Sequence, residues 1–127
     1  RCRVSTFTEA RTALVTAFTD AELVAFGYQP GTLIPPAVIV DYGDPWLEPS
    51  RIGTPIAARI RLVAVATVAV VDAANVRDQL EQLVESILAA IPSGFTVENV
   101  DRPNVDDTGS QGSVLEARIN LTAQVRG

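Results

Sequence analysis

Histidine, lysine and methionine are absent from the sequence, and cysteine occurs once, as Cys2. Because histidine is the commonest general base and the commonest metal ligand, its absence excludes Ser-His and Cys-His nucleophile pairs and disfavours hydrolases. A single cysteine excludes a disulfide or a thiolate metal site within one chain and is typical of a reducing compartment. No glycine-rich phosphate-binding pattern follows a strand. We therefore expect no catalytic residue, no metal and no cofactor.

Long apolar runs are also missing. The longest, from Leu62 to Val71, is interrupted by Thr67 and falls well short of the ~20 residues that a membrane helix needs. The net charge of -5 and the pI near 4.6 disfavour a free-standing nucleic-acid binder, because phosphate contact depends on basic residues. The 127 residues, of which 47% are hydrophobic, predict one soluble domain spanning 1–127.

Two segments have the apolar periodicity of amphipathic helices. Thr6-Phe7-Thr8-Glu9 has the spacing of a capping box, and the helix that follows should end near Thr19. Asp72 is a suitable N-cap for the second helix, which should stop at Pro92-Ser93-Gly94. The expected apolar stripes are Phe7, Ala10, Leu14, Val15 and Phe18 in the first helix, and Val76, Leu80, Leu83, Val84, Ile87, Leu88 and Ile91 in the second.

The remaining segments are typical of strands. We expect strands over Leu23–Tyr28, Ala37–Tyr42, Ile56–Val71, Phe95–Arg102 and Ser113–Val125, with a polar loop from Pro103 to Gly112. In the last strand apolar and polar residues alternate, so one side should be buried. The predicted fold is α+β, with a mixed, mainly antiparallel β-sheet packed against two α-helices in a single domain.

The long strand changes character along its length. In its first half Arg59 and Arg61 alternate with apolar residues, which predicts one wet face. The two arginines are candidates for pairing with acids of a neighbouring subunit, or they lie on a solvated sheet edge. In its second half both faces are apolar, so helices, another sheet or another subunit should cover both sides.

The segment from Asp41 to Pro55 contains the one tryptophan among proline, glycine and acidic residues, and it is predicted to be a loop. We expect Trp46 and Leu47 to anchor this loop by folding onto the core, because an exposed pair would form a sticky patch. The outer residues of the loop, Asp44, Glu48 and Arg51, are then candidate contacts to an adjoining ring or subunit.

Adjacent acids offer weak candidates for an ion site. Asp106 and Asp107 lack the spacing of a calcium loop, so a solvated loop pair is the simpler interpretation. Both remain candidate interface residues, because the loop that carries them is exposed on sequence grounds. Glu81 and Glu85 lie one helical turn apart on the polar face of the second helix, where solvated charge is expected.

Several segments together resemble the tail terminator and minor tail proteins of long-tailed, siphovirus-type bacteriophages. They are the amphipathic first helix, "IPPAVIVDYGDPWLEPS", "RIRLVAVATV", "VRDQLEQLVESILAAIP" and the terminal "EARINLTAQV". The resemblance spans nearly the whole chain and rests on the order of elements and on a Pro-Pro-x-Val strand followed by an Asp-Pro-aromatic loop.

The resemblance implies a structural virion protein of the tail neck, assembled in the host cytoplasm. Such proteins form a homo-oligomeric ring, a hexamer, that caps the tail tube and ends its polymerisation. The implied partners are the tail tube protein and the head-tail connector, and genome DNA passes through the lumen without specific binding. The alternatives are another phage neck or head-completion protein, and, in a different class, a small-ligand-binding or enzyme domain of α+β type.

Overall fold

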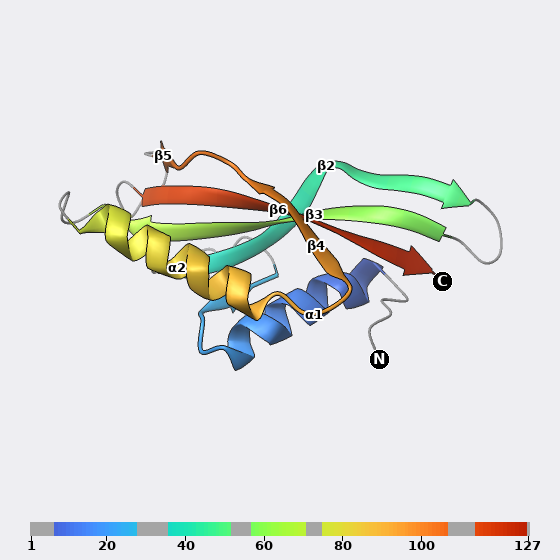
Figure 1. Ribbon diagram of the computed structural model, residues 1–127, viewed down its shortest axis with the longest axis horizontal. Coiled ribbons are helices and arrows are strands. Elements are labelled where there is room, and N and C mark those ends of the chain that lie inside the picture. The colour runs from blue at the N-terminus through green and yellow to red at the C-terminus, as the bar shows by residue number, and fades with distance from the viewer. Residues whose placement is uncertain (1–6, 28–35, 52–56, 71–74, 107–113, 127) are drawn as a thin grey trace.

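The structure is a computed structural model that describes residues 7–27, 36–51, 57–70, 75–106 and 114–126 (Figure 1). The elements follow in the order α1 (Phe7–Asp20), β1 (Ala25–Phe26), β2 (Ala37–Arg51), β3 (Ala57–Ala69), α2 (Val76–Ala90), β4 (Phe95–Val100), β5 (Asn104–Asp106) and β6 (Val114–Arg126). They confirm the α+β class expected from the sequence.

The six strands form one sheet. Its order is β1-β2-β3-β6-β4, with β5 pairing to β6 beyond the end of β4. β1 pairs with β2 in parallel, and the other pairings are antiparallel. β3 and β6 are paired without a break from Ala57↔Arg126 to Ala69↔Val114 and form the centre of the sheet. Arg59 and Arg61 therefore lie on a central strand, so the alternative that placed them on a solvated sheet edge is wrong.

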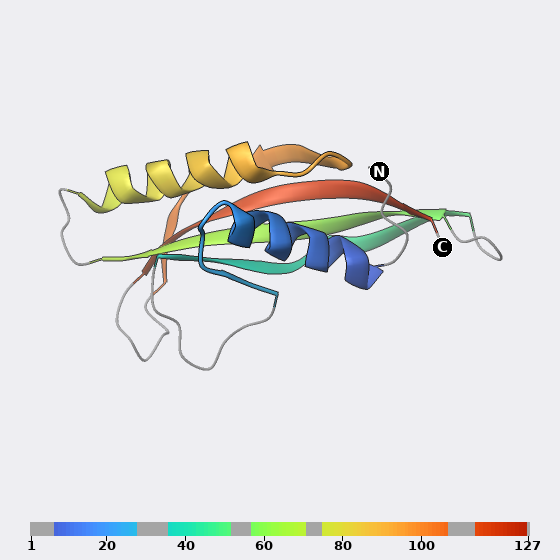
Figure 2. The ribbon, with the colours of Figure 1, turned by 90° about the horizontal axis from the view of Figure 1, so that it is seen from below.

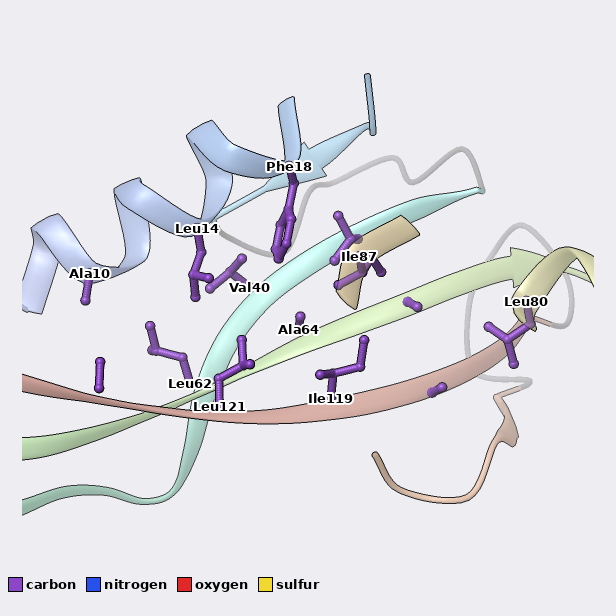
Figure 3. Packing of buried hydrophobic residues seen from close by; sticks show 14 of the residues in the cluster. Ala10, Leu14, Phe18, Val40, Leu62, Ala64, Leu80, Ile87, Ile119 and Leu121 are labelled. Carbon is purple, nitrogen blue, oxygen red and sulfur yellow. The ribbon is translucent and has the colours of Figure 1, made fainter. Parts of the chain in front are cut away.

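Both helices pack on one face of this sheet, here called the helix face. Ala10, Leu14 and Phe18 recur every four residues along α1 and are fully buried, as the first apolar stripe predicts. They meet the inward side chains of the strands, such as Val40 and Leu121, and α2 adds Leu80 and Ile87 (Figure 3). Burying a large apolar side chain stabilises the fold by about 1.5–3 kcal/mol, so this layer is the main source of stability.

The second helix differs from expectation at its N-cap and at Leu88. It begins after Asn75, whose backbone oxygen accepts from Gln79 N at 3.0 Å, so the prediction of Asp72 as N-cap is wrong. Leu88 is 40% exposed, because it lies at the margin of a stripe centred on Leu80 and Ile87. The stop is confirmed: α2 ends at Ala90, and Gly94 adopts a φ of 96°, which favours glycine.

The second strand is much longer than predicted. β2 continues from Ala37 to Arg51, so the expected loop from Asp41 is wrong over that range. The prolines are accommodated for two reasons. Only the first part of β2 pairs with β1, which leaves the rest on the sheet margin, and a register shift separates the pairs Tyr42↔Leu62 and Leu47↔Ile60. The extra residues form a bulge opposite β3.

The face of the sheet away from the helices, here called the far face, has its own small core. Ile39, Val63 and Val65 are buried there in a separate cluster, and buried Thr67 donates a hydrogen bond from its hydroxyl to Ala37 O at 3.2 Å. The doubly buried half of the long strand is therefore confirmed. Figure 2 shows α2 along one side of the thin sheet, and both helices belong to the other cluster, so neither covers the far face.

The last third of the chain follows the predicted alternation. Ala117, Ile119, Leu121 and Ala123 of β6 are buried on the helix face. The predicted loop from Pro103 contains a short strand instead, because Asn104–Asp106 pairs with β6 through Asn104↔Glu116 to Asp106↔Val114. The part of that loop from Asp107 to Gly112 lies outside the described residues.

Candidate functional site

Arg61 is the centre of a charged cluster on the far face. Its guanidinium Nη2 lies 2.7 Å from Glu48 Oε1, and its Nη1 lies 3.8 Å from Glu98 Oε1. The Arg61 side chain is 21% exposed, against 46% for Glu48 and 35% for Glu98, so the cation is the most enclosed member. Arg61 thus links β2, β3 and β4 across the sheet. The shorter contact is a charge-assisted hydrogen bond, and such bonds contribute more than neutral ones.

Arg59 takes a more marginal part in the same cluster. Its Nη1 is 3.9 Å from Glu48 Oε1, and its side chain is 49% exposed. Ion pairs with this exposure contribute about 0–1 kcal/mol. Both arginines were candidates for pairing with a neighbour's acids. In the structure they pair within the chain, and Glu48, predicted to face a partner, is their shared acid.

The bulge in β2 is held close to Arg61 by a glycine. A Cβ placed on Gly43 would lie 2.6 Å from Arg61 Cβ and 3.0 Å from its carbonyl carbon and oxygen. Real side chains do not approach that closely, so position 43 has room for hydrogen alone. The peptide bond that follows Asp44, to Pro45, is cis. Asp44 therefore lies within a bulge whose backbone touches the strand that carries the arginines.

A polar concavity of about 410 Å³ opens beside this bulge. Its lining comes from four strands and the segment after β4 and includes Asp44, Arg61, Glu98, Asp101, Arg118 and Asn120. The floor is tied together between β4 and β6, where the Asn120 side-chain amide donates to the Asn99 side-chain oxygen and Asp101 N donates to Arg118 O at 2.8 Å. The lining mixes carboxylates with guanidinium groups, which suits contact with polar or charged protein surface.

The two residues of the predicted anchor pair, Trp46 and Leu47, differ in burial. Leu47 is partly buried and packs against the main core, as expected. Trp46 is 37% exposed and lies against Tyr42, itself 54% exposed, with ring centroids 4.9 Å apart and an interplanar angle of 57°. The prediction that the indole folds onto the core is therefore wrong, because the strand alternation that turns Leu47 inward turns its neighbour outward. The anchoring role of the pair stays a prediction.

Three other candidate interface residues, Arg51, Asp106 and Asp107, are not seen to join the charged cluster. Arg51 is the last residue of β2, where its backbone pairs with Ala57, and Asp106 ends β5, where its backbone pairs with Val114. The side chains of both are outside the described structure, as is all of Asp107. The structure therefore brings together Asp44, Glu48, Arg59 and Arg61 but not these three.

The sequence did not single out the β4 and β6 members of the site. Glu98, Asn99 and Asp101 follow no chemical motif, and Arg118 and Asn120 are ordinary polar positions of an alternating strand. The missing information is the register, since the pairs Val63↔Asn120 and Val65↔Arg118 place β6 beside the arginine strand. The alternation of apolar and polar residues along β6 correctly indicated which side chains are solvent-facing. Which of them lie beside Arg61 depends on the pairing of β6 with β3, which is distant in the sequence.

Among residues 7–27, 36–51, 57–70, 75–106 and 114–126, no group of three or more His, Cys, Asp or Glu is placed to hold a metal ion. Within the same ranges no helix has the length and apolar character needed to cross a membrane. No known protein family matches the chain, and no curated protein sequence matches it.

Proposed function

We propose that this chain is a structural component of a long-tailed bacteriophage, which forms a ring on the end of the tail tube, stops tube polymerisation and joins the tail to the head connector. Its partners in this proposal are further copies of itself, the tail tube protein and the connector, and genome DNA passes through the ring. The proposed site of action is the neck of the virion, and the proposed role is assembly and not enzymatic turnover.

The observation that carries the proposal is the resemblance of nearly the whole chain to tail terminator proteins. The segment "IPPAVIVDYGDPWLEPS" is its most specific part, and in the fold it supplies β2, the bulge and the acid that binds Arg61. The residues of the resemblance are thus the ones that shape the exposed side of the sheet.

The layer arrangement supports the same proposal. The helices cover one face, while the far face carries the open polar concavity lined by Asp44, Arg61 and Arg118. A concavity lined by charged and amide side chains suits a polar contact between subunits. The net charge of -5 is compatible with DNA passing a wall without adhering to it.

The alternative of a ligand-binding or enzyme domain expects an enclosed apolar pocket with a few convergent polar groups. The concavity beside Arg61 is instead lined largely by charged and amide side chains. The described geometry therefore favours a protein-contact role over a small-molecule site.

The direct test is to add the purified chain to tail tube protein during polymerisation and to measure tube lengths by negative-stain electron microscopy. We expect shorter tubes, each with a ring at one end, in proportion to the chain added. Bovine serum albumin at the same concentration is the control. Tubes that keep the control length and carry no terminal density would overturn the proposal.

A further inference from the structure

An exposed aromatic patch lies at the β2 margin of the sheet. Tyr42 and Trp46 pack on each other and keep 54% and 37% of their surface exposed. Asp41 precedes Tyr42 and Asp44 lies between the two aromatic residues in the sequence, and both acids are exposed. This set of four residues is here called the bulge patch. Paired aromatic rings beside charge are typical of protein-protein contacts, because each ring buries a large area for little loss of side-chain entropy.

The backbone of this margin is unsuited to receive another strand. Pro45 and Pro49 lack the N–H group that a strand ladder requires, and the bulge at Gly43–Trp46 breaks the register. A partner must therefore contact the bulge patch through side chains. This requirement points to a groove or hollow on the partner and not to a strand edge.

The opposite margin of the sheet provides such a hollow. A groove of about 420 Å³ runs between the start of α2 and the segment from Arg102 through β5. Leu80, Val105 and Leu115 give it an apolar lining, and Val105 is 51% exposed. Pro103, Arg77, Glu81 and Arg102 complete the lining, which therefore contains two arginines and one glutamate.

The two surfaces cannot meet within one chain. The bulge patch belongs to β2, and the groove to α2, β5 and β6 on the far side of β3, as the strand order and Figure 1 show. We propose that they meet between two copies of this chain, with the Trp46 ring on the apolar lining near Val105 and Asp44 near Arg102. This inference deepens the proposed function, since it names the surfaces through which subunits of the ring associate.

Three properties make the match specific. The acids of the bulge patch oppose a groove with an excess of arginine, which favours the correct approach. An indole beside a guanidinium group adds a cation–π attraction. Because the two surfaces are different, the contact is head-to-tail, and a head-to-tail contact repeats from copy to copy and forms a ring when the rotation between copies closes.

The test is an exchange of charges measured by sedimentation velocity on the full chain. Asp44→Arg and Arg102→Glu are each expected to weaken self-association by about tenfold or more. A mixture of the two variants in equal amounts, or one chain carrying both changes, restores opposite charges at every contact and should regain association. Glu85→Arg, a matched charge change on the exposed face of α2 outside the groove, should associate like wild type.

A second measurement does not depend on charge. In a Cys2→Ser background, Tyr42→Cys and Val105→Cys chains are mixed with a short bismaleimide crosslinker. We expect a crosslinked dimer in the mixture and little in either chain alone, because the contact joins unlike surfaces. A dimer formed equally by each chain alone, or none in the mixture, would contradict the inference.

Other outcomes are equally decisive. A wild-type chain that stays monomeric at all concentrations, or single variants that associate normally, overturns the inference. If the variants associate normally and wild type still caps tail tubes, the contact is wrong and the proposed function stands. If the charge exchange behaves as expected and tubes are never capped, the contact stands and the proposed function fails. An Asp44→Arg chain that self-associates but no longer caps tubes identifies the tube protein as the occupant and overturns the contact between copies.

Discussion

The two faces of the sheet are stabilised by different means. On the helix face, fully buried side chains such as Phe18, Leu14 and Ile119 pack between the sheet and two helices. On the far face, a small apolar cluster lies next to ion pairs centred on Arg61, whose partners are 35–46% exposed. The helix face therefore supplies most of the stability, whereas the polar part of the far face and the margins of the sheet are open to contacts with other molecules.

The strongest test of this comparison removes a side chain from the helix face. Phe18→Ala deletes a ring that is fully buried between α1 and the sheet. We expect the free energy of unfolding to fall by about 3–5 kcal/mol, because a cavity adds to the lost burial. Urea denaturation followed by circular dichroism measures it. Leu88→Ala, at a site 40% exposed, is the control and should change the value by about 0.5 kcal/mol or less.

The next effect concerns the close approach of the bulge to Arg61. Gly43→Ala places a methyl group 2.6 Å from Arg61 Cβ and 3.0 Å from its backbone, and the central strand cannot move aside cheaply. We expect a loss of about 1–3 kcal/mol, typical of overpacking. Gly27→Ala is the matched control, because its methyl group would meet Val15 and Arg11 side-chain atoms at ordinary distances of 3.4–3.6 Å. Equal stability of the two variants would show that the bulge does not depend on glycine.

The two arginines of the far face differ in exposure and should differ in their contribution to stability. Arg61→Ala leaves Glu48 and Glu98 without their enclosed cation, and we expect a loss of about 1–3 kcal/mol. Arg59→Ala removes an exposed pair with atoms 3.9 Å apart and should cost about 0.5 kcal/mol or less. A double-mutant cycle of Arg61→Ala with Glu48→Gln measures the coupling between them. Coupling near zero, or equal losses for both arginines, would remove Arg61 from the centre of the cluster.

The helix face was largely predictable from the sequence. The four-residue spacing of Ala10, Leu14 and Phe18, and the alternation along β6, are local patterns that burial produces directly. Arg59 and Arg61 were placed on the wet side of β3 for the same reason. The predicted N-cap of α2 was wrong because aspartate and asparagine are both common capping residues, and local preference does not choose between Asp72 and Asn75.

The far face was less predictable because its contacts join distant segments. The link from Arg61 to Glu98 depends on β4 and β3 flanking β6, and no local pattern encodes that order. The extension of β2 was missed because Pro45 and Pro49 argue against a strand, and they are tolerated here by a bulge at the sheet margin. The prediction that Trp46 points inward assumed that residues 41–55 form a loop. Because Trp46 lies in β2 instead, that prediction was also wrong.

Two neighbouring residues of β2, Leu47 and Trp46, differ in burial and should differ in their effect on stability. Leu47 packs against the main core, so Leu47→Ala should reduce the free energy of unfolding by about 2 kcal/mol. Trp46 is 37% exposed and packs against Tyr42, and loss of an exposed aromatic pair should cost about 1 kcal/mol or less. Urea denaturation of both variants gives these values.

The two substitutions should affect self-association in the reverse order, with the larger loss in Trp46→Ala. If the bulge patch is the contact between copies, Trp46→Ala weakens sedimentation-detected association strongly, because the ring supplies apolar area to the partner, while Leu47→Ala acts on association through folding alone. The decisive comparison is made at a temperature where both variants remain folded by circular dichroism. A Trp46→Ala chain that loses stability like Leu47→Ala yet associates like wild type would make the indole a structural anchor. The outward part of the bulge would then have no role between copies.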